Sequence, residues 1–389
     1  MDPQQRILLE IAYESFQNAG LSTDSLWGSD TGVFVGQWTS DYHEIVTRDV
    51  ERPPLYLVMG TGPAISSNRI SYYFNLRGPS FTVDTGCSSS FVALHQAVQS
   101  LRAGETSQCF VGGVNLVADP QRLCYQSGLK MFSDEGRSFA FDSRANGYGR
   151  GEGCTGVVLK PLSAAVRDGN HIRALIRNSV LNQDGRTPGI SVPSAAAQRE
   201  AIIKAYRQAG LEVRADYVEA HGTGTKVGDP IEVSAIAAAL SSNKTGTPLR
   251  RRMPIGSIKG NIGHTEGAAG LAGLIKAVLM LEHGAIPPQA NYEKGNPDIP
   301  LEEWNLTVSR HPSTFSLSHF RTSSSYAGVL ANLNNKFRFH ASLNARICAE
   351  SPLTGMSNLP ISNKSVHVCD SVLIMLAALA MVVPMRTLS

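Results

Sequence analysis

The sequence lacks the cysteine patterns of metal-binding and disulfide-rich proteins. Its six cysteines form no CxxC pair and stand at Cys87, Cys109, Cys124, Cys154, Cys348 and Cys369. The spacing therefore predicts neither a metal site nor a disulfide framework. The first residues, MDPQQRILLE, also lack the apolar core of a signal peptide. Together these absences favour a reducing, cytoplasmic setting.

The chain also lacks a strong net charge and a membrane-spanning run. Lys plus Arg number 35 and Asp plus Glu number 32, which leaves a formal charge of +3. This balance argues against nucleic acid or an anionic membrane as the main partner. The longest apolar run, VLIMLAALAMVV at 372–383, is shorter than the ~20 residues that a bilayer requires. We expect either a short buried helix there or a segment foreign to the fold.

What is present is the pattern of an α/β protein. Asp2 and Pro3 open a helix, as a capping side chain followed by a first-turn proline, and Gly20 ends it. Strands are expected at 31–37, 109–117, 155–159, 173–179 and 217–219, and a hairpin at 71–84. Further helices are expected at 195–209, 230–240 and 266–282. Alternating strands and helices predict an α/β fold with a substantially buried sheet.

The stretch FTVDTGCSSSFVALHQAV at 81–98 contains the first candidate for chemistry. A β-like run ends near Val83, and apolar residues recur at helical spacing after Cys87. Gly86 can adopt the backbone angles of a sharp turn. We therefore expect Cys87 at a strand-to-helix corner, where the helix N-terminus lowers the pKa of a thiol and favours the nucleophilic thiolate. The alternative is a buried structural cysteine.

A glycine-rich loop with a histidine follows the strand expected at 217–219. His221 stands where that strand ends, and Thr223 and Thr225 offer hydroxyls to an elongated ligand lying along the loop. A phosphate-binding loop is a rival interpretation, but the Gly-Lys-Ser/Thr ending of the Walker pattern is absent. A purely structural loop histidine is the other alternative.

A second such loop, GSIKGNIGHTEGAAG, spans 256–270. His264 stands at its turn, beside the start of a helix. Lys259 can reach the same cleft or hold a neighbouring carboxylate. The small residues at 267–273 predict that the following helix packs very closely against another element.

Taken together, these segments closely resemble the β-ketoacyl synthase family, and more narrowly the ketosynthase domain of a fungal type I, highly reducing polyketide synthase. The resemblance runs from residue 1 to about 310. The matching motifs, in family order, are DPQQRILLEIAYESFQNAG (2–20), GPSFTVDTGCSSS (78–90), FDSRANGYGRGEG (141–153), VEAHGTGTKVGDPIE (218–232) and GSIKGNIGHTEGAAG (256–270). The resemblance implies a thiolase-like fold, two similar α/β halves in five layers (α-β-α-β-α), and a homodimer.

The same resemblance implies a reaction, a decarboxylative Claisen condensation by an acyltransferase of the 3-oxoacyl-carrier-protein synthase type. Cys87 would hold an acyl chain as a thioester, and its backbone N–H would supply part of an oxyanion hole. His221 and His264 would support decarboxylation of a malonyl thioester, while Lys259 would keep the histidine site ordered. Thr223 and Thr225 would contact the phosphopantetheine arm of an acyl carrier protein, the expected partner. No cofactor would be bound directly.

The sequence departs from the family at both ends. The family's first strand region precedes the motif at residue 2, so we expect a ketosynthase domain over 1–310 that lacks that strand, with its halves meeting near 160–175. The family's closing glycine-rich loop corresponds to 321–332, where only Tyr326, Gly328 and Asn332 align. We therefore expect a divergent tail over 311–389, not native to the fold. The alternative function is a truncated, inactive ketosynthase remnant, or a dimerising partner of an intact synthase.

Overall fold

The structure is a computed structural model that describes residues 1–241, 252–314, 326–331, 336–342 and 372–376. The last three ranges are described by their backbone pairing alone. The helix expected from Asp2 to Gly20 is confirmed as α1 (Pro3–Asn18), and the Asp2 side chain accepts a hydrogen bond from the Gln4 N–H. Of the described residues, no helix is long and apolar enough to cross a membrane.

The strands of the first half surround the candidate cysteine. They are β1 (Gly32–Gln37), β2 (Ser80–Val83), β3 (Cys109–Asn115) and β4 (Gly153–Pro161). Short helices connect them or follow them: α2 (Thr23–Leu26), α3 (Asp41–Val46), α4 (Leu57–Thr61), α7 (Pro120–Ser127) and α8 (Leu162–Arg167). β1 pairs in parallel with β2 and β3, and β4 runs antiparallel to β3.

The second half has β5 (Ala174–Asn182), β6 (Tyr217–Glu219), β7 (Met253–Gly256) and β9 (Leu306–Val308). Two strands from the C-terminal part of the chain, β11 (Tyr326–Ala331) and β12 (Lys336–Ser342), lie between β5 and β6. A separate ribbon joins β8 (Ala285–Ile286) to β10 (Ser313–Thr314). The strands expected at 31–37, 109–117, 155–159, 173–179 and 217–219 are therefore all found.

Hydrogen bonds link the main strands in the order β2-β1-β3-β4-β13-β5-β12-β11-β6-β7-β9. The two sides of the junction between β13 (Val372–Leu376) and β5 are similar in strand direction. From the β2 edge inward, two parallel pairs are followed by two antiparallel pairs. From the β9 edge inward, three parallel pairs are followed by two antiparallel pairs, because β9 adds one strand. The chain is thus built of two similar α/β halves, and β13 takes in the first half the position that β5 takes in the second.

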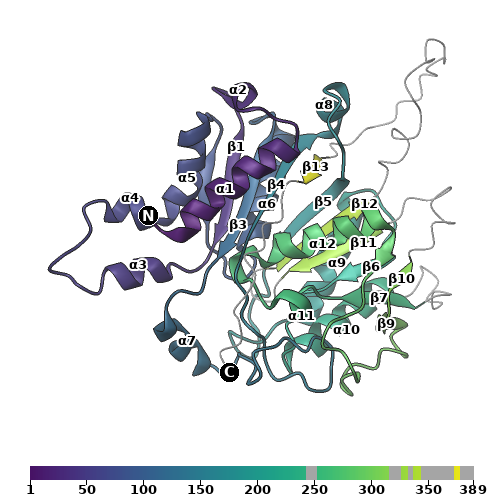
Figure 1. The fold of residues 1–389 in the computed structure, drawn as a ribbon. Helices are drawn as coiled ribbons and strands as arrows, with labels where there is room; N and C mark the ends of the chain where they lie inside the picture. The colour runs from purple at the N-terminus through teal and green to yellow at the C-terminus, as the bar shows by residue number, and fades with distance from the viewer. Residues whose placement is uncertain (242–251, 315–325, 332–335, 343–371, 377–389) are drawn as a thin grey trace, which may run out of the picture.

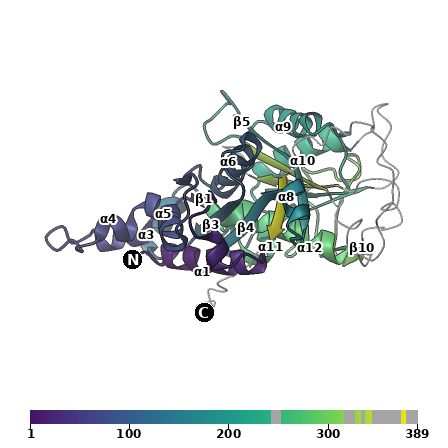
Figure 2. The ribbon, with the colours of Figure 1, turned by 90° about the horizontal axis from the view of Figure 1, so that it is seen from above.

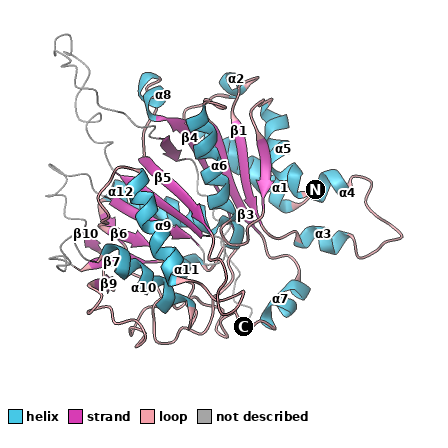
Figure 3. Cartoon of the chain, turned by 180° about the vertical axis from the view of Figure 1, so that it is seen from behind, coloured by secondary structure: helices cyan, strands magenta, loops and turns pink. Residues whose placement is uncertain are grey.

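Helices cover both faces of each half (Figures 1 and 3). In the first half, α1 and α5 (Pro63–Phe74) pack on β1, β3 and β4, and α6 (Ser89–Ala103) packs on β1 and β3 from the other side. In the second half, α12 (Ala269–His283) packs on β6 and β11. The helix α9 (Ala195–Gln208) packs on β5 and β12, and α10 (Gly228–Leu240) packs against α9. Seen from above, α1 and α9 lie on opposite sides of the strands (Figure 2). Because α6 contacts α12, the halves share a helical layer and five layers result.

Two expectations of local structure are wrong. The hairpin expected at 71–84 is the end of α5 followed by the single strand β2. Ser66, Ile70 and Phe74 recur every four residues and are buried, whereas the β-favouring Tyr72 and Tyr73 are exposed, so the helical period determines the structure. The buried helix considered for the apolar run is wrong for Val372–Leu376, which form β13; residues 377–383 lie outside the described residues.

Candidate active site

Cys87 lies at the corner between β2 and α6, as the sequence predicts. Gly86 has a φ of +66°, and its N–H is bonded to the Asp84 carboxylate at 2.9 Å. Ser89 closes the turn, since its hydroxyl donates to the Gly86 carbonyl at 2.6 Å and accepts from the Thr85 N–H at 2.9 Å. These bonds fix the backbone on both sides of the cysteine.

Glycines bring this corner into the centre of the molecule. A Cβ on Gly36 of β1 would lie 2.2 Å from the Ser90 nitrogen, so α6 can start only against a glycine. A Cβ on Gly270 of α12 would lie 2.8 Å from the Phe91 ring. The close packing expected of the small residues at 267–273 is confirmed, and it places the His264 loop beside the start of α6.

His264 is held in one tautomer by its own backbone. Its Nδ1 accepts the Glu266 N–H at 3.1 Å, so in the neutral ring the proton must be on Nε2. The side chain is fully buried, and Nε2 has no hydrogen-bond partner among the described residues. A buried donor without a partner carries a free-energy cost. Within the described part of the chain, the Nε2–H of His264 is therefore available to a ligand that enters the site.

His221 lies against His264. The ring centroids are 5.4 Å apart and the planes are nearly perpendicular, at 85°. The ring of Tyr148 also packs edge-on against His264, with the two ring centroids 4.9 Å apart. Burial lowers the pKa of both histidines well below the ordinary value, and Lys259 acts in the same direction. Both imidazoles are thus neutral near pH 7.

The backbone of His221 is fixed from two directions. The Glu232 carboxylate accepts the N–H groups of His221 at 2.7 Å and of Gly222 at 2.9 Å. Lys259 Nζ donates to the His221 carbonyl at 2.8 Å. Lys259 is buried, and in this structure it contacts the strand end that carries the histidine.

The expected low pKa of Cys87 is wrong for this structure. Burial raises the pKa of the thiol to about 12, and the Glu266 carboxylate acts in the same direction. Lys259 and Arg150 oppose this rise but do not outweigh it. The helix N-terminus contributes less than desolvation here because the corner is sunk between the two halves. Near pH 7 the Cys87 side chain is therefore a thiol, and it interacts electrostatically with Lys259 and with Tyr148.

Thr223 and Thr225 follow His221 along the loop, and their hydroxyls lie 3.2 Å apart. Thr223 is buried and Thr225 half-buried. The loop is closed by Asp229, whose carboxylate accepts the N–H groups of Phe141 at 2.9 Å and Gly224 at 3.1 Å. Burial raises the pKa of Asp229 to about 7.

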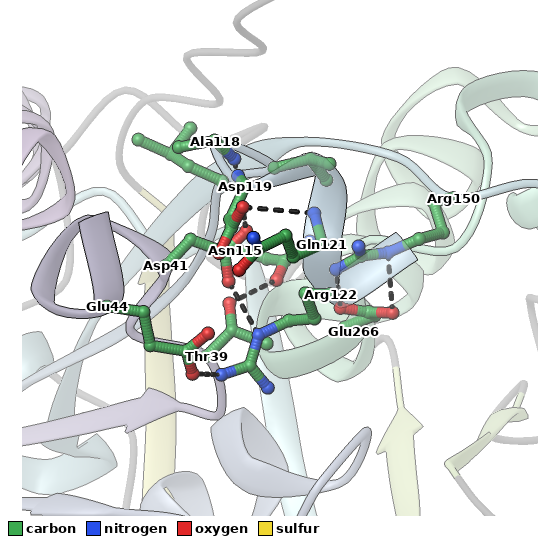
Figure 4. Close-up of polar contacts among 12 residues, drawn as sticks. Thr39, Asp41, Glu44, Asn115, Ala118, Asp119, Gln121, Arg122, Arg150 and Glu266 are labelled. Atoms are coloured by element: carbon green, nitrogen blue, oxygen red, sulfur yellow. Dashed lines mark hydrogen bonds and ion pairs between the residues drawn. The ribbon is translucent and has the colours of Figure 1, made fainter. Parts of the chain in front are cut away.

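Glu266, whose N–H donates to His264, is part of a buried ion pair. Arg150 and Glu266 form two parallel bonds, Nε to Oε1 at 3.0 Å and Nη2 to Oε2 at 2.7 Å, and their side chains are only 4% and 0% exposed (Figure 4). Nearby, Arg122 pairs with Asp41 at 2.8 Å and with Glu44 (Figure 4). This second cluster ties α3 to the start of α7.

The sequence-predicted residues Cys87, His221, His264 and Lys259 thus come from three segments of the chain: the β2–α6 corner, the loop after β6 and the loop at 256–270. Sequence reasoning missed Glu232, Asp229, Arg150 and Glu266 as members of the site, although all four lie inside the motifs quoted above. The available signal was a buried carboxylate next to a glycine-rich loop, because such loops expose several backbone N–H groups that need an acceptor.

Comparison with known families agrees with this geometry. Residues 1–165 match the family model "Beta-ketoacyl synthase, N-terminal domain", and residues 173–293 match "Beta-ketoacyl synthase, C-terminal domain". The chain is 78% identical over 308 residues to the highly reducing polyketide synthase easB of Emericella nidulans, which covers 79% of this chain and 12% of that protein. It is 74% identical over 335 residues to cm3B of Cordyceps militaris, covering 86% of this chain and 13% of that protein.

Among solved structures, the ketosynthase from module 6 of the bacillaene synthase of Bacillus subtilis 168 is similar, with a TM-score of 0.81 and 35% identity. That match covers 88% of this chain and 59% of the bacterial chain. The chain therefore spans only part of each of these relatives. The five motifs, the two family models and the two-half architecture lead to one conclusion: the chain belongs to the β-ketoacyl synthase family and has the thiolase-like fold of the ketosynthases.

Proposed function

We propose that this chain carries out the condensation step of polyketide synthesis, as an acyltransferase of the β-ketoacyl-carrier-protein synthase type. The observation that carries the proposal is the pair of buried neutral histidines, one with an N–H that has no partner among the described residues, next to Lys259 and Tyr148, which both interact electrostatically with Cys87. The similarity to fungal highly reducing polyketide synthases supports the same reading.

The first half-reaction would place an acyl chain on Cys87. The sulfur attacks the carbonyl of an acyl thioester, the bond from that carbonyl to the carrier sulfur breaks, and the thiol proton passes to the departing carrier thiolate. Thiolates both attack and leave well, so the acyl group can be held and later released. The positive charge of Lys259 favours the transient thiolate of Cys87.

The second half-reaction would use the histidines. Loss of CO₂ from a malonyl thioester leaves an enolate, and negative charge gathers on the thioester oxygen. The Nε2–H of His264 can donate to that oxygen, and His221 lies beside it at right angles. Preorganised donors aimed at a developing charge are usually a large contribution to catalysis. The enolate carbon then attacks the acyl carbonyl, the bond from that carbonyl to the Cys87 sulfur breaks, and the departing thiolate takes a proton from solvent water.

The partners are part of the proposal. An acyl carrier protein would deliver both thioesters, with Thr223 and Thr225 contacting its phosphopantetheine arm, and the reaction would take place in the cytoplasm.

We propose a homodimer, supported by the edge position of β2, which leaves one side of that strand without a described partner strand. Phe81 on β2 is 38% exposed and Tyr72 is 88% exposed. We also propose that the two halves meet near residues 160–175 and that the tail over 311–389 is divergent.

A labelling experiment tests the first half-reaction. Purified protein is incubated with a radiolabelled acyl thioester, and label is expected on Cys87 but not in Cys87→Ala. Cys124→Ala is the matched control, because Cys124 is an exposed cysteine on α7 and should be dispensable. Label that is absent from the wild type, or that disappears with Cys124→Ala, would overturn the proposal and favour an inactive remnant.

A further inference from the structure

Behind the His221 strand end lies a buried polar cluster that the proposed mechanism does not use. It consists of Glu219 and Tyr217 on β6 and Lys276 on α12. Lys276 Nζ donates to Glu219 Oε2 at 2.7 Å and to the Tyr217 hydroxyl at 2.9 Å. The Tyr217 hydroxyl in turn donates to the same Glu219 oxygen at 2.6 Å. Glu219 and Tyr217 are each 1% exposed.

The cluster fits a space that only glycine permits. A Cβ on Gly256 of β7 would lie 2.4 Å from the Tyr217 hydroxyl. Gly256 pairs directly with Glu219 in the sheet. The triad therefore occupies a defined position between β6, β7 and α12.

The second oxygen of Glu219 points toward the site. Glu219 Oε1 accepts the Ile258 N–H at 2.6 Å. Ile258 lies in the turn between Ser257 and Lys259, and both of these neighbours donate to the His221 carbonyl, from Ser257 Oγ at 3.1 Å and Lys259 Nζ at 2.8 Å. One carboxylate thus anchors the turn whose two donors hold the histidine strand end.

Glu219 also acts on Lys259 through charge. Burial lowers the pKa of Lys259, and Glu219 is the strongest of the groups that oppose this. The charged and titratable groups acting on Lys259 are Glu219, Glu232, Asp229 and Cys87, and Lys259 itself acts on His221 and His264. Glu232 and Asp229 are already engaged with backbone N–H groups of the His221 loop.

We propose that Glu219 is a positioning residue for the condensing reaction: it anchors the 257–259 turn through Ile258, and its charge balances that of Lys259. The inference rests on the proposed function for its kinetic consequence, but the placement of His221 that it describes can be measured without turnover. Lys276, whose Nζ lies 2.7 Å from Glu219 Oε2, holds the carboxylate in the orientation that serves both roles.

The test compares Glu219→Gln with Tyr217→Phe, which removes a hydrogen bond to the same oxygen but leaves every charge. In Glu219→Gln, decarboxylation of a malonyl thioester should fall on the order of tenfold to a hundredfold in kcat, as expected for a displaced reacting group. Acylation of Cys87 should stay within about twofold of the wild type. The pKa of Lys259 falls when its counter-charge is removed, so the alkaline limb of the decarboxylation profile should move to lower pH.

Glu282→Gln is the matched control, because it removes a carboxylate from the end of α12 that pairs with Arg173 at 3.0 Å away from the site. It should leave rate and pH profile unchanged. Equal shifts of the alkaline limb in Glu219→Gln and Tyr217→Phe, or no shift in Glu219→Gln, would overturn the proposal.

Histidine-labelled protein provides the measurement that does not depend on activity. The ¹⁵N signals of His221 and His264 and their pH dependence should change in Glu219→Gln and stay close to wild type in Tyr217→Phe. Unchanged histidine signals in Glu219→Gln would overturn the inference. A wild type without decarboxylase activity would overturn the proposed function alone, and the histidine spectra would still decide the role of Glu219.

Discussion

Replacing Arg150 with methionine should destabilise the protein strongly, because Glu266 would then keep a buried charge without its partner. The two side chains are 4% and 0% exposed and share two short bonds. Removing one member of such a pair typically costs about 3–5 kcal/mol. In urea denaturation this should lower the midpoint by about 1 M or more, given the slopes usual for folded domains.

The double variant Arg150→Met/Glu266→Gln should recover most of that loss, since it removes both charges. Glu293→Gln is the control, because Glu293 pairs with Arg144 at 2.9 Å but is 76% exposed; it should change the free energy of unfolding by less than ~1 kcal/mol. A loss below ~1 kcal/mol for Arg150→Met would refute the reasoning.

The loss of stability in Arg150→Met should depend on pH, and the direction of this dependence follows from the pKa of Glu266. Burial raises the pKa of Glu266 above its ordinary value of 4.5, and loss of Arg150 raises it further. The folded state then binds a proton more readily than the unfolded state. The free energy of unfolding, relative to wild type, should therefore fall as the pH rises above the raised pKa that Glu266 has in the folded wild type. A relative stability that rises with pH would contradict this sign.

Three further perturbations follow from the site. Glu232→Gln should slow malonyl-thioester decarboxylation at least about tenfold while Cys87 acylation persists, because the carboxylate holds the N–H groups of His221 and Gly222; an unchanged rate would contradict this. Alkylation of Cys87 by iodoacetamide, followed in Cys124→Ala, should rise about tenfold per pH unit to about pH 10, since the thiol pKa is about 12; a plateau near neutral pH would show a lower value. Gly36→Ala should abolish soluble folded protein, since its Cβ would lie 2.2 Å from the Ser90 nitrogen, whereas Gly60→Ala, with its nearest atom at 3.6 Å, should fold normally by circular dichroism.

Local sequence patterns correctly predicted the turns at which the candidate residues lie. The Cys87 corner depends on Gly86, and both histidine loops depend on glycines, so the residue types alone indicated sharp turns next to helices. The distance between the loops could not be predicted this way. It depends on Gly36, Gly113 and Gly270, which let α6 approach β1, β3 and α12, and no pattern within one segment contains that contact.

The pKa of Cys87 shows a second limit of sequence reasoning. A helix N-terminus is visible in the sequence, but the depth of the corner between two halves is not. Desolvation therefore outweighs the helix and the cations Lys259 and Arg150. The strands β11, β12 and β13 show a third limit, since their places in the sheet follow from pairing with β4, β5 and β6 rather than from any periodicity of their own.

The most direct test of the central claim is the formation of the carbon–carbon bond. The chain is incubated with an acyl thioester and a malonyl-carrier thioester, and products are identified by mass spectrometry. The account predicts a β-ketoacyl product two carbons longer with the wild type, and none with Cys87→Ala. Absence of that product from a folded wild type, or its formation by Cys87→Ala, would contradict the claim that Cys87, His221 and His264 form a working condensing site.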